Sequence, residues 1–164
     1  MASLRVLTPR ILFGHPVEHV DPDALAIDAY DIACSHVYEV RLPEEGKRAL
    51  IRTDDPLAPR AYVATGVLFV LTNCGVAVWS PTKGTASHGV PLPDSAVQTR
   101  HGILVIHQIG CIMFGHSGGI SWEYRHDHLV DFHCGPETVM LAFDDGSKHE
   151  VDLGSGRRRS PASS

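Results

Sequence analysis

The chain has 164 residues, of which 43% are hydrophobic and 20% charged, and its formal net charge at pH 7 is -5. This length and composition predict one soluble globular domain and exclude a chain that is disordered throughout. The acidic balance makes nucleic acid an unexpected partner. No apolar run approaches the roughly 18 residues of a membrane-spanning helix, so no membrane contact is expected.

The first predicted element is a short helix near residues 22–30. Asp21 is a good helix-capping residue, Pro22 suits the first helical position, and alanines follow. Beyond this helix, the apolar residues come in runs of four to six that are bounded by Gly, Pro, Asn or Asp, which is typical of strands. The first of these runs predict a hairpin over residues 37–52.

A repeat organises the chain from residue 66 onwards. Residues 66–70 (GVLFV) recur as 102–106 (GILVI), and residues 75–79 (GVAVW) recur as 110–114 (GCIMF). The first pair is offset by 36 residues and the second by 35. The alignment therefore predicts that one residue has been lost between the two blocks.

A third unit fits the same pattern more loosely, with a predicted hairpin over residues 138–153. Gly75, Gly110 and Gly146 are expected to occupy equivalent hairpin turns. One hairpin cannot bury its own apolar face, whereas several joined or stacked hairpins can. The repeat therefore predicts an all-β fold of tandem antiparallel β-hairpins, in a propeller-like or sandwich-like arrangement.

The domain organisation follows from where these patterns end. A single β-rich domain is predicted over residues 1–153. Residues 154–164 contain three consecutive arginines followed by Ser, Pro and Ala, which predicts a disordered basic tail. Three arginines in a flexible end favour a solvated segment over a contact with nucleic acid or an acidic partner.

Four cysteines lie at positions 34, 74, 111 and 134, without a C-x-x-C pair or a spacing typical of zinc. The first ten residues contain no apolar core of a signal peptide. Together these features predict a cytoplasmic protein with reduced thiols, and a disulfide between two of the cysteines is the alternative.

Residues 102–124 combine a G-x-L-x-V strand at Gly102, a turn glycine at Gly110, a second strand, and a corner formed by Ser117-Gly118 and Trp122. This pattern resembles one blade of a pyrroloquinoline-quinone-type β-propeller repeat. The resemblance implies that the hairpins are blades and that Trp122 packs between neighbours, and it implies no particular function. A closed propeller needs four or more blades of about 40 residues, which this chain barely supplies. A sandwich, or a meander completed by a second subunit, is therefore an alternative arrangement.

A second pattern is spread over the first two thirds of the chain. Residues 29–32 (AYDI), 38–43 (YEVRLP) and 48–53 (RALIRT) resemble the first motif region of trimeric dUTPases, and residues 80–84 (SPTKG) lie where that family has A-P-R-S-G. Thr82 and Lys83 replace the Arg and Ser of that phosphate-binding motif. The resemblance thus implies a diverged nucleotide-binding relative.

The densest set of potential ligands is the segment His126–His133, which contains three histidines and two aspartates. On a strand, alternate residues share a face, so His126 and His128 are expected to point the same way. Together with His107 or His116 from the preceding hairpin they would form a possible zinc site. The alternative is a polar strand with Val130 and Phe132 inside and no cofactor.

These observations favour a non-catalytic binding or protein-interaction module on a β-repeat scaffold, which would bind a protein partner or form a homo-oligomer. The alternative is a hydrolase, either metal-dependent through the His126–His133 cluster or derived from a dUTPase-like ancestor. No catalytic residue is assigned.

Overall fold

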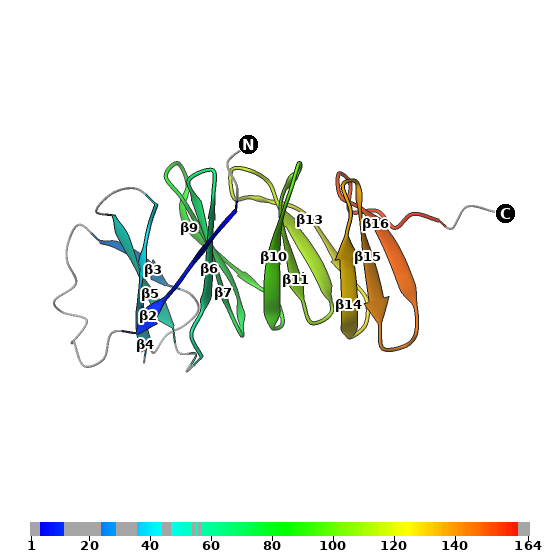
Figure 1. The fold of residues 1–164 in the computed structure, drawn as a ribbon, viewed down its shortest axis with the longest axis horizontal. Helices are drawn as coiled ribbons and strands as arrows, with labels where there is room; N and C mark the ends of the chain where they lie inside the picture. Colours follow the sequence, from blue (N-terminus) through cyan, green and yellow to red (C-terminus); the bar gives the residue numbers. More distant parts are fainter. Residues whose placement is uncertain are drawn as a thin grey trace. The chain divides into compact units, whose positions relative to one another are not determined.

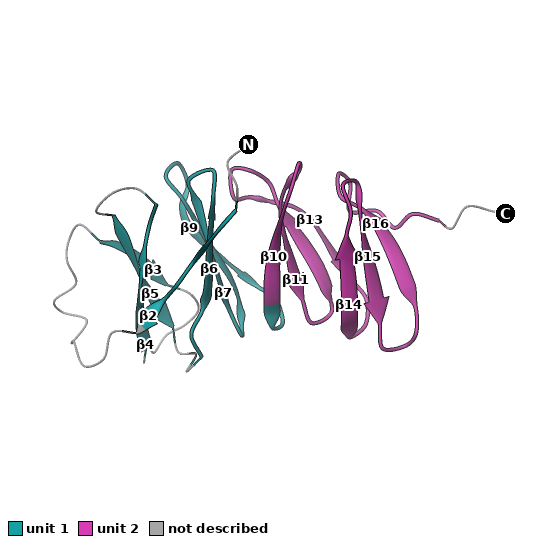
Figure 2. Cartoon of the chain, viewed as in Figure 1, with its two compact units in different colours: residues 1–93 teal, residues 94–164 magenta. Residues whose placement is uncertain are grey.

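Figure 1 shows the fold in a computed structural model, which describes residues 4–11, 24–28, 36–43, 47–53, 55 and 57–160. The described residues form strands and turns and contain no helix. The predicted all-β fold with antiparallel hairpins is therefore confirmed. The chain divides into two compact units, residues 1–93 and 94–164, which are coloured separately in Figure 2.

The first unit contains a five-stranded antiparallel sheet. Its third strand, VLFVLT, is buried along its whole length, because a run of β-branched and aromatic residues suits a strand that is covered on both faces. Across the sheet the strands are β1 (Arg5–Leu7), β6 (Arg60–Ala64), β7 (Val67–Thr72), β8 (Gly75–Ser80) and β9 (Gly84–Gly89).

A four-stranded sheet packs against it within the same unit. Ile27, Tyr38 and Ile51 from this sheet join Leu68 and Val70 of β7 in one buried apolar cluster. In order across the sheet, its strands are β2 (Arg10–Ile11), β4 (His36–Arg41), β5 (Arg48–Thr53) and β3 (Leu25–Asp28).

The helix predicted near residues 22–30 is wrong over the part that the structure describes, because Leu25–Asp28 is strand β3. This strand runs parallel to β5, with Ile27 opposite Ile51. Ile27 is fully buried, so a pairing with residues far along the chain overrides the weak local helix propensity of these four residues. Residues 22, 23, 29 and 30 lie outside the described part of the chain.

The second unit contains two antiparallel sheets that enclose a core of their own. Leu104, Ile106 and Met113 of one sheet and Leu141 and Val151 of the other are buried in it. The first sheet comprises β10 (Pro93–Thr99), β11 (Gly102–His107), β12 (Gly110–Phe114) and β13 (Ile120–Arg125), and the second comprises β14 (Leu129–Cys134), β15 (Thr138–Phe143) and β16 (Lys148–Asp152).

The repeat is visible in how the hairpins align. The turn at Thr65–Gly66 matches the turn at Arg100–His101, and the turn that ends before Gly75 matches the one that ends before Gly110. The offset is 35 residues in both cases, so the predicted loss of one residue is wrong: Gly66 lies in a turn, whereas Gly102 begins a strand. Gly75 and Gly110 each begin the second strand of a hairpin directly after its turn, so these two positions correspond.

Gly146 differs from these two glycines, so the predicted equivalence of the three hairpin turns is wrong for it. It lies inside a wider turn that is closed by a hydrogen bond from Phe143 N to Ser147 O, at 3.0 Å. Its φ of +82° is a conformation that glycine adopts without strain. The third hairpin is thus a looser copy of the repeat, as its sequence indicates.

The segment from Gly154 to Ser160 is ordered by β16, which differs from the disordered tail predicted for it. Asp152 N donates to Arg157 O at 2.9 Å, Arg159 N donates to Glu150 O at 2.7 Å, and Arg158 forms a β-bridge with Val151. Residues 157–159 therefore lie along β16 in the place of a fourth strand. Residues 161–164 are outside the described part.

The Asp152 carboxylate holds this segment in place. It accepts hydrogen bonds from Gly154 N at 3.1 Å, Ser155 N at 3.0 Å and the Arg159 guanidinium at 2.8 Å. The Arg159 and Ser155 donors stabilise the charged form and lower the pKa of Asp152 to about 2. The Asp152 carboxylate thus holds Arg159 and the backbone of residues 154–155 close to the end of β16.

Replacing Asp152 with alanine should release this segment from β16. The amide of Arg159 is expected to exchange with deuterium at least about ten times faster in the variant, because local opening controls its protection. Asp131→Asn is the matched control, since Asp131 is exposed on β14 of the same sheet and its carboxylate accepts from the neighbouring Phe132 N. Unchanged exchange at Arg159 in Asp152→Ala would show that the backbone pairing alone holds the segment.

Candidate functional site

The predicted ligands His126 and His128 do not lie on a strand. Both are in the loop between β13 and β14, which begins at Leu129. The pairing of β14 with β15 shifts register between Leu129 and Asp131. This irregularity leaves Val130 exposed at 58%, whereas the alternation predicted from the sequence placed it inside, and Phe132 packs on the core as predicted.

His107 lies at the end of β11, on the face opposite the core of the second unit. Its side chain is fully buried, and Nε2 is 3.9 Å from Glu123 Oε1. Burial, and to a smaller extent Arg125, lower the pKa of His107 to about 4, although Glu123 acts in the opposite direction. His107 is therefore neutral at pH 7.

His116 lies in the loop between β12 and β13, where its Nε2 is hydrogen-bonded to the carbonyl oxygen of Arg100 at 3.1 Å. The four predicted ligands thus occupy three separate places in the second unit. Among the residues that the structure describes, no group of three or more His, Cys, Asp or Glu side chains is arranged to hold a metal ion. The possible zinc site stays a prediction.

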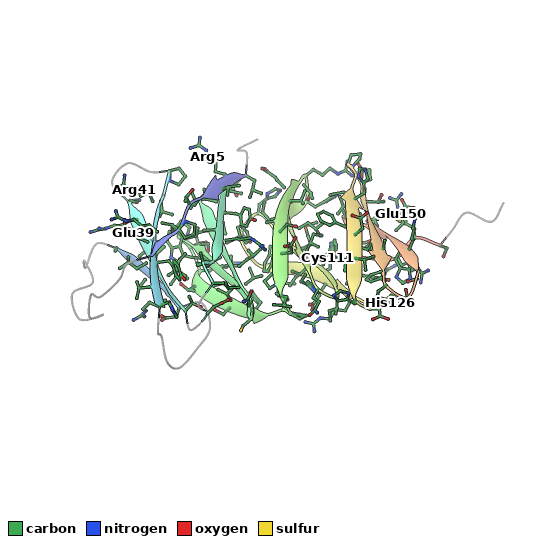
Figure 3. All side chains as sticks on the ribbon, turned by 60° about the horizontal axis from the view of Figure 1, so that its bottom comes forward. Arg5, Glu39, Arg41, Cys111, His126 and Glu150 are labelled. Carbon is green, nitrogen blue, oxygen red and sulfur yellow. The ribbon has the colours of Figure 1, made fainter. Side chains whose placement is uncertain are left out.

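The structure brings together a different set of side chains, here called the histidine cluster: His126, His149, Tyr124, Phe143 and Asp145. The ring centroids of His126 and His149 are 4.3 Å apart, and His126 also lies 4.8 Å from Phe143. Figure 3 labels His126 at one end of the second unit and Cys111 in the core between its sheets.

Two hydrogen bonds fix the imidazole rings of the cluster. The Tyr124 hydroxyl is bonded to His149 Nδ1 at 2.7 Å, and His126 Nε2 is bonded to Asp145 Oδ2 at 3.2 Å. Each histidine therefore has one ring nitrogen engaged by a side chain from another element. Such pairing fixes the ring orientation.

Local sequence explains why Asp145 and His149 lie where they do. The turn Asp144-Asp145-Gly146-Ser147 directs the Asp145 carboxylate to Ser147 N at 2.8 Å, an arrangement typical of Asx turns. His149 then falls opposite Leu141, at an inward position of β16, and is 3% exposed. The Ser147 hydrogen bonds lower the pKa of Asp145.

Burial determines the charge state of His149. Removal from water lowers its pKa, and the charges of Arg158 and His126 lower it further, while Asp145 acts against them. Burial also raises the pKa of Tyr124. At neutral pH the centre of the cluster is therefore an uncharged Tyr–His pair, with the Asp145 carboxylate at its exposed side.

The reasoning from sequence did not identify His149. The available signal was the hairpin register, because His149 alternates with Val151 and Leu153 along the return strand and so shares their inward face. His126 was identified, although for a different partner. Tyr124 and Asp145 carry no motif, and only the tertiary structure brings them together with the two histidines.

Acidification should destabilise the protein through His107. Its folded pKa is about 4, below the roughly 6.5 of an unfolded histidine. The unfolded chain therefore binds more protons between these values, and the free energy of unfolding should fall by on the order of 3 kcal/mol as pH drops from 6.5 to 4. Urea unfolding of the protein and of His107→Leu at several pH values tests this. The variant should show a flatter pH dependence, and equal slopes would contradict the assignment.

Comparison of the chain with models of known protein families and with curated proteins gave no match. Within its described residues, no helix has the length and apolarity needed to cross a membrane. Function is therefore inferred from the structure of the two units.

Proposed function

We propose that the chain is a non-catalytic protein-interaction module, in which a scaffold of β-hairpins presents an open sheet edge to an extended segment of a partner. The supporting observation is strand β9. It is the last strand of its sheet in the described part of the chain, and five of its six residues are exposed.

Strand β9 lacks the usual protection of a sheet edge. Natural proteins protect such edges with charged side chains, bulges or covering segments, because unpaired N–H and C=O groups accept another strand. The sequence of β9, GTASHG, contains no Asp, Glu, Lys or Arg. Every other strand that ends a sheet among the described residues carries a charge: Arg5, Arg10, Asp28, Asp94, Glu123, Asp131 and Glu150.

The side chains of β9 suit a partner that binds through its backbone. Thr85, Ala86 and Ser87 are small, so an approaching strand meets no bulky group along most of the edge. Ser87 Oγ also donates to Asp28 O of β3 at 3.3 Å, which ties the strand to the neighbouring sheet. Strand addition gains its affinity from main-chain hydrogen bonds and its specificity from alternate side chains.

A displayed library of random peptides tests this proposal. Peptides selected on the protein should lose at least about tenfold in affinity for Ala86→Lys, because a lysine protects a sheet edge. Met140→Lys is the matched control, since Met140 is also exposed but lies on the central strand β15. Equal loss in both variants, or no selected peptide at all, would contradict the proposal.

A second copy of the chain is the other partner that this edge fits, because two exposed edges can pair with each other. Sedimentation over a range of concentrations separates the two cases. Self-association that Ala86→Lys abolishes would identify the partner as another copy of the chain, and a monomer that binds selected peptides would identify a different protein.

A further inference from the structure

Residues 157–159, here called the arginine segment, pair with β16 as a short additional strand. Arg158 forms an antiparallel bridge with Val151. Two backbone hydrogen bonds of 2.9 and 2.7 Å flank this bridge, one on each side. All three contacts share one antiparallel register, so the arginine segment continues the sheet beyond β16.

The side chains of the two paired strands are complementary in charge. Arg159 Nη2 lies 2.8 Å from Asp152 Oδ2, and its Nη1 lies 3.9 Å from Glu150 Oε1. Glu150 is labelled on β16 in Figure 3. Ion pairs at exposed positions contribute little free energy, whereas complementary charges determine which partner binds and in which register. The acidic side chains of β16 therefore select a basic segment.

A closed turn of three residues, 154–156, connects β16 and the residue after it to the arginine segment. Gly156 N donates to Asp152 O at 2.8 Å, and Gly156 has a φ of +70°, which glycine adopts without strain. The Asp152 carboxylate accepts from Gly154 N and Ser155 N. These bonds hold the turn itself closed. Opening the turn would break them and leave the pairing surfaces of both strands unchanged.

We propose that two copies of the chain exchange the arginine segment, so that each copy places it on β16 of the other. In an antiparallel pair each residue of one strand has a fixed partner on the other strand. The pairing of Arg158 with Val151 therefore has the same register within one chain and between two. Reciprocal exchange gives a closed two-fold dimer. The strand contacts are the same in both forms, and only the conformation of the turn 154–156 differs.

A second copy is the occupant that the structure favours for the edge of β16. The arginine segment is already seated on this edge, and it matches both the backbone register and the two acidic side chains. Because the closed turn favours the monomer, the dimer should form as the protein concentration rises. The exchange concerns the second unit alone and does not depend on the function proposed for β9.

Replacing Gly156 with proline should shift this equilibrium towards the dimer. Proline fixes φ near about −65°, which excludes the closed turn, and it lacks the N–H that bonds to Asp152 O. It also favours an extended conformation of the preceding Ser155. Sedimentation equilibrium is expected to show dimerisation at least about ten times tighter than without Gly156→Pro, with Ala86→Lys present in both chains to exclude pairing through β9.

Two controls identify the exchange itself. Gly156→Pro combined with Arg159→Glu should be monomeric, because the new carboxylate faces Asp152 and Glu150. In a mixture of differently isotope-labelled Gly156→Pro chains, nuclear Overhauser contacts between Arg158 and Val151 should appear between chains. A dimer that pairs through another surface would show these contacts only within each chain.

Three outcomes would overturn the exchange: a Gly156→Pro chain that stays monomeric with its arginine segment released, a dimer without the contact between chains, and a dimer that Arg159→Glu leaves intact. If Gly156→Pro does not fold, the wild-type chain at millimolar concentration decides. The contact between labelled copies must then appear and grow with concentration, and its absence contradicts the proposal.

Discussion

Replacing Gly110 with alanine should cost roughly 4 kcal/mol or more of the free energy of unfolding. Gly110 has a φ of +150°, and a Cβ at this position would lie 2.1 Å from Tyr124 O in the neighbouring strand. That oxygen belongs to the backbone of β13, which pairs with β12 through Gly110 and Arg125. Relief of the clash therefore requires the two strands to move apart.

Gly146→Ala is the matched control for this prediction. Gly146 also has a positive φ, +82°, but no atom lies within 4 Å of a Cβ built there. It should show only the conformational cost, about 1–2 kcal/mol. Urea unfolding of both variants measures the difference, and equal costs would mean that the sheet adjusts to the extra methyl group.

Removing the side chain of Trp122 should cost roughly 3 kcal/mol, at the lower end for large-to-small changes because the residue is half-buried. The indole belongs to β13 and packs on Gly156, and its Nε1 donates to Leu153 O at 3.0 Å. Trp122 thus links the two sheets of the second unit. Thermal or urea unfolding of Trp122→Ala tests the size of this link.

Two further variants divide the contribution of Trp122. Trp122→Phe keeps an aromatic ring and loses the hydrogen bond, so about 1 kcal/mol is expected. Gly156→Ala keeps the tryptophan but adds a Cβ 2.6 Å from its indole ring, at a φ of +70°. This contact should displace the ring. A near wild-type stability for both Trp122→Ala and Gly156→Ala would refute the link between the sheets.

The hairpins of both units were predictable because their signals are local. Alternating or continuous apolar runs and the turn glycines Gly75 and Gly110 mark each strand pair within about a dozen residues. Strand β3 was not predictable in this way. Its pairing with β5 is parallel and joins Ile27 to Ile51, so the information that overrides a helical start lies far along the chain.

The candidate site shows the same contrast between local and distant signals in the sequence. The sequence singled out His126 but placed it on a strand, because nothing in the local pattern distinguishes a polar loop from a polar strand. His149 and Asp145 approach it only because the β15–β16 turn folds back on the loop, which hydrophobic periodicity does not specify. The three arginines of the C-terminal segment likewise carry no local signal for pairing with β16, because the donors to Asp152 are spread over Gly154, Ser155 and Arg159.

That C-terminal segment has a practical consequence. Residues 157–159 shield the outer backbone of β16, and the peptide bonds after these arginines are the ones that trypsin-like proteases cleave. Pairing with β16 withholds them from such an enzyme, which needs an extended and accessible substrate. Cleavage after these arginines would leave the outer backbone of β16 unpaired. Such an edge can pair with a strand of another chain, so cleavage at this point is expected to promote association of the protein.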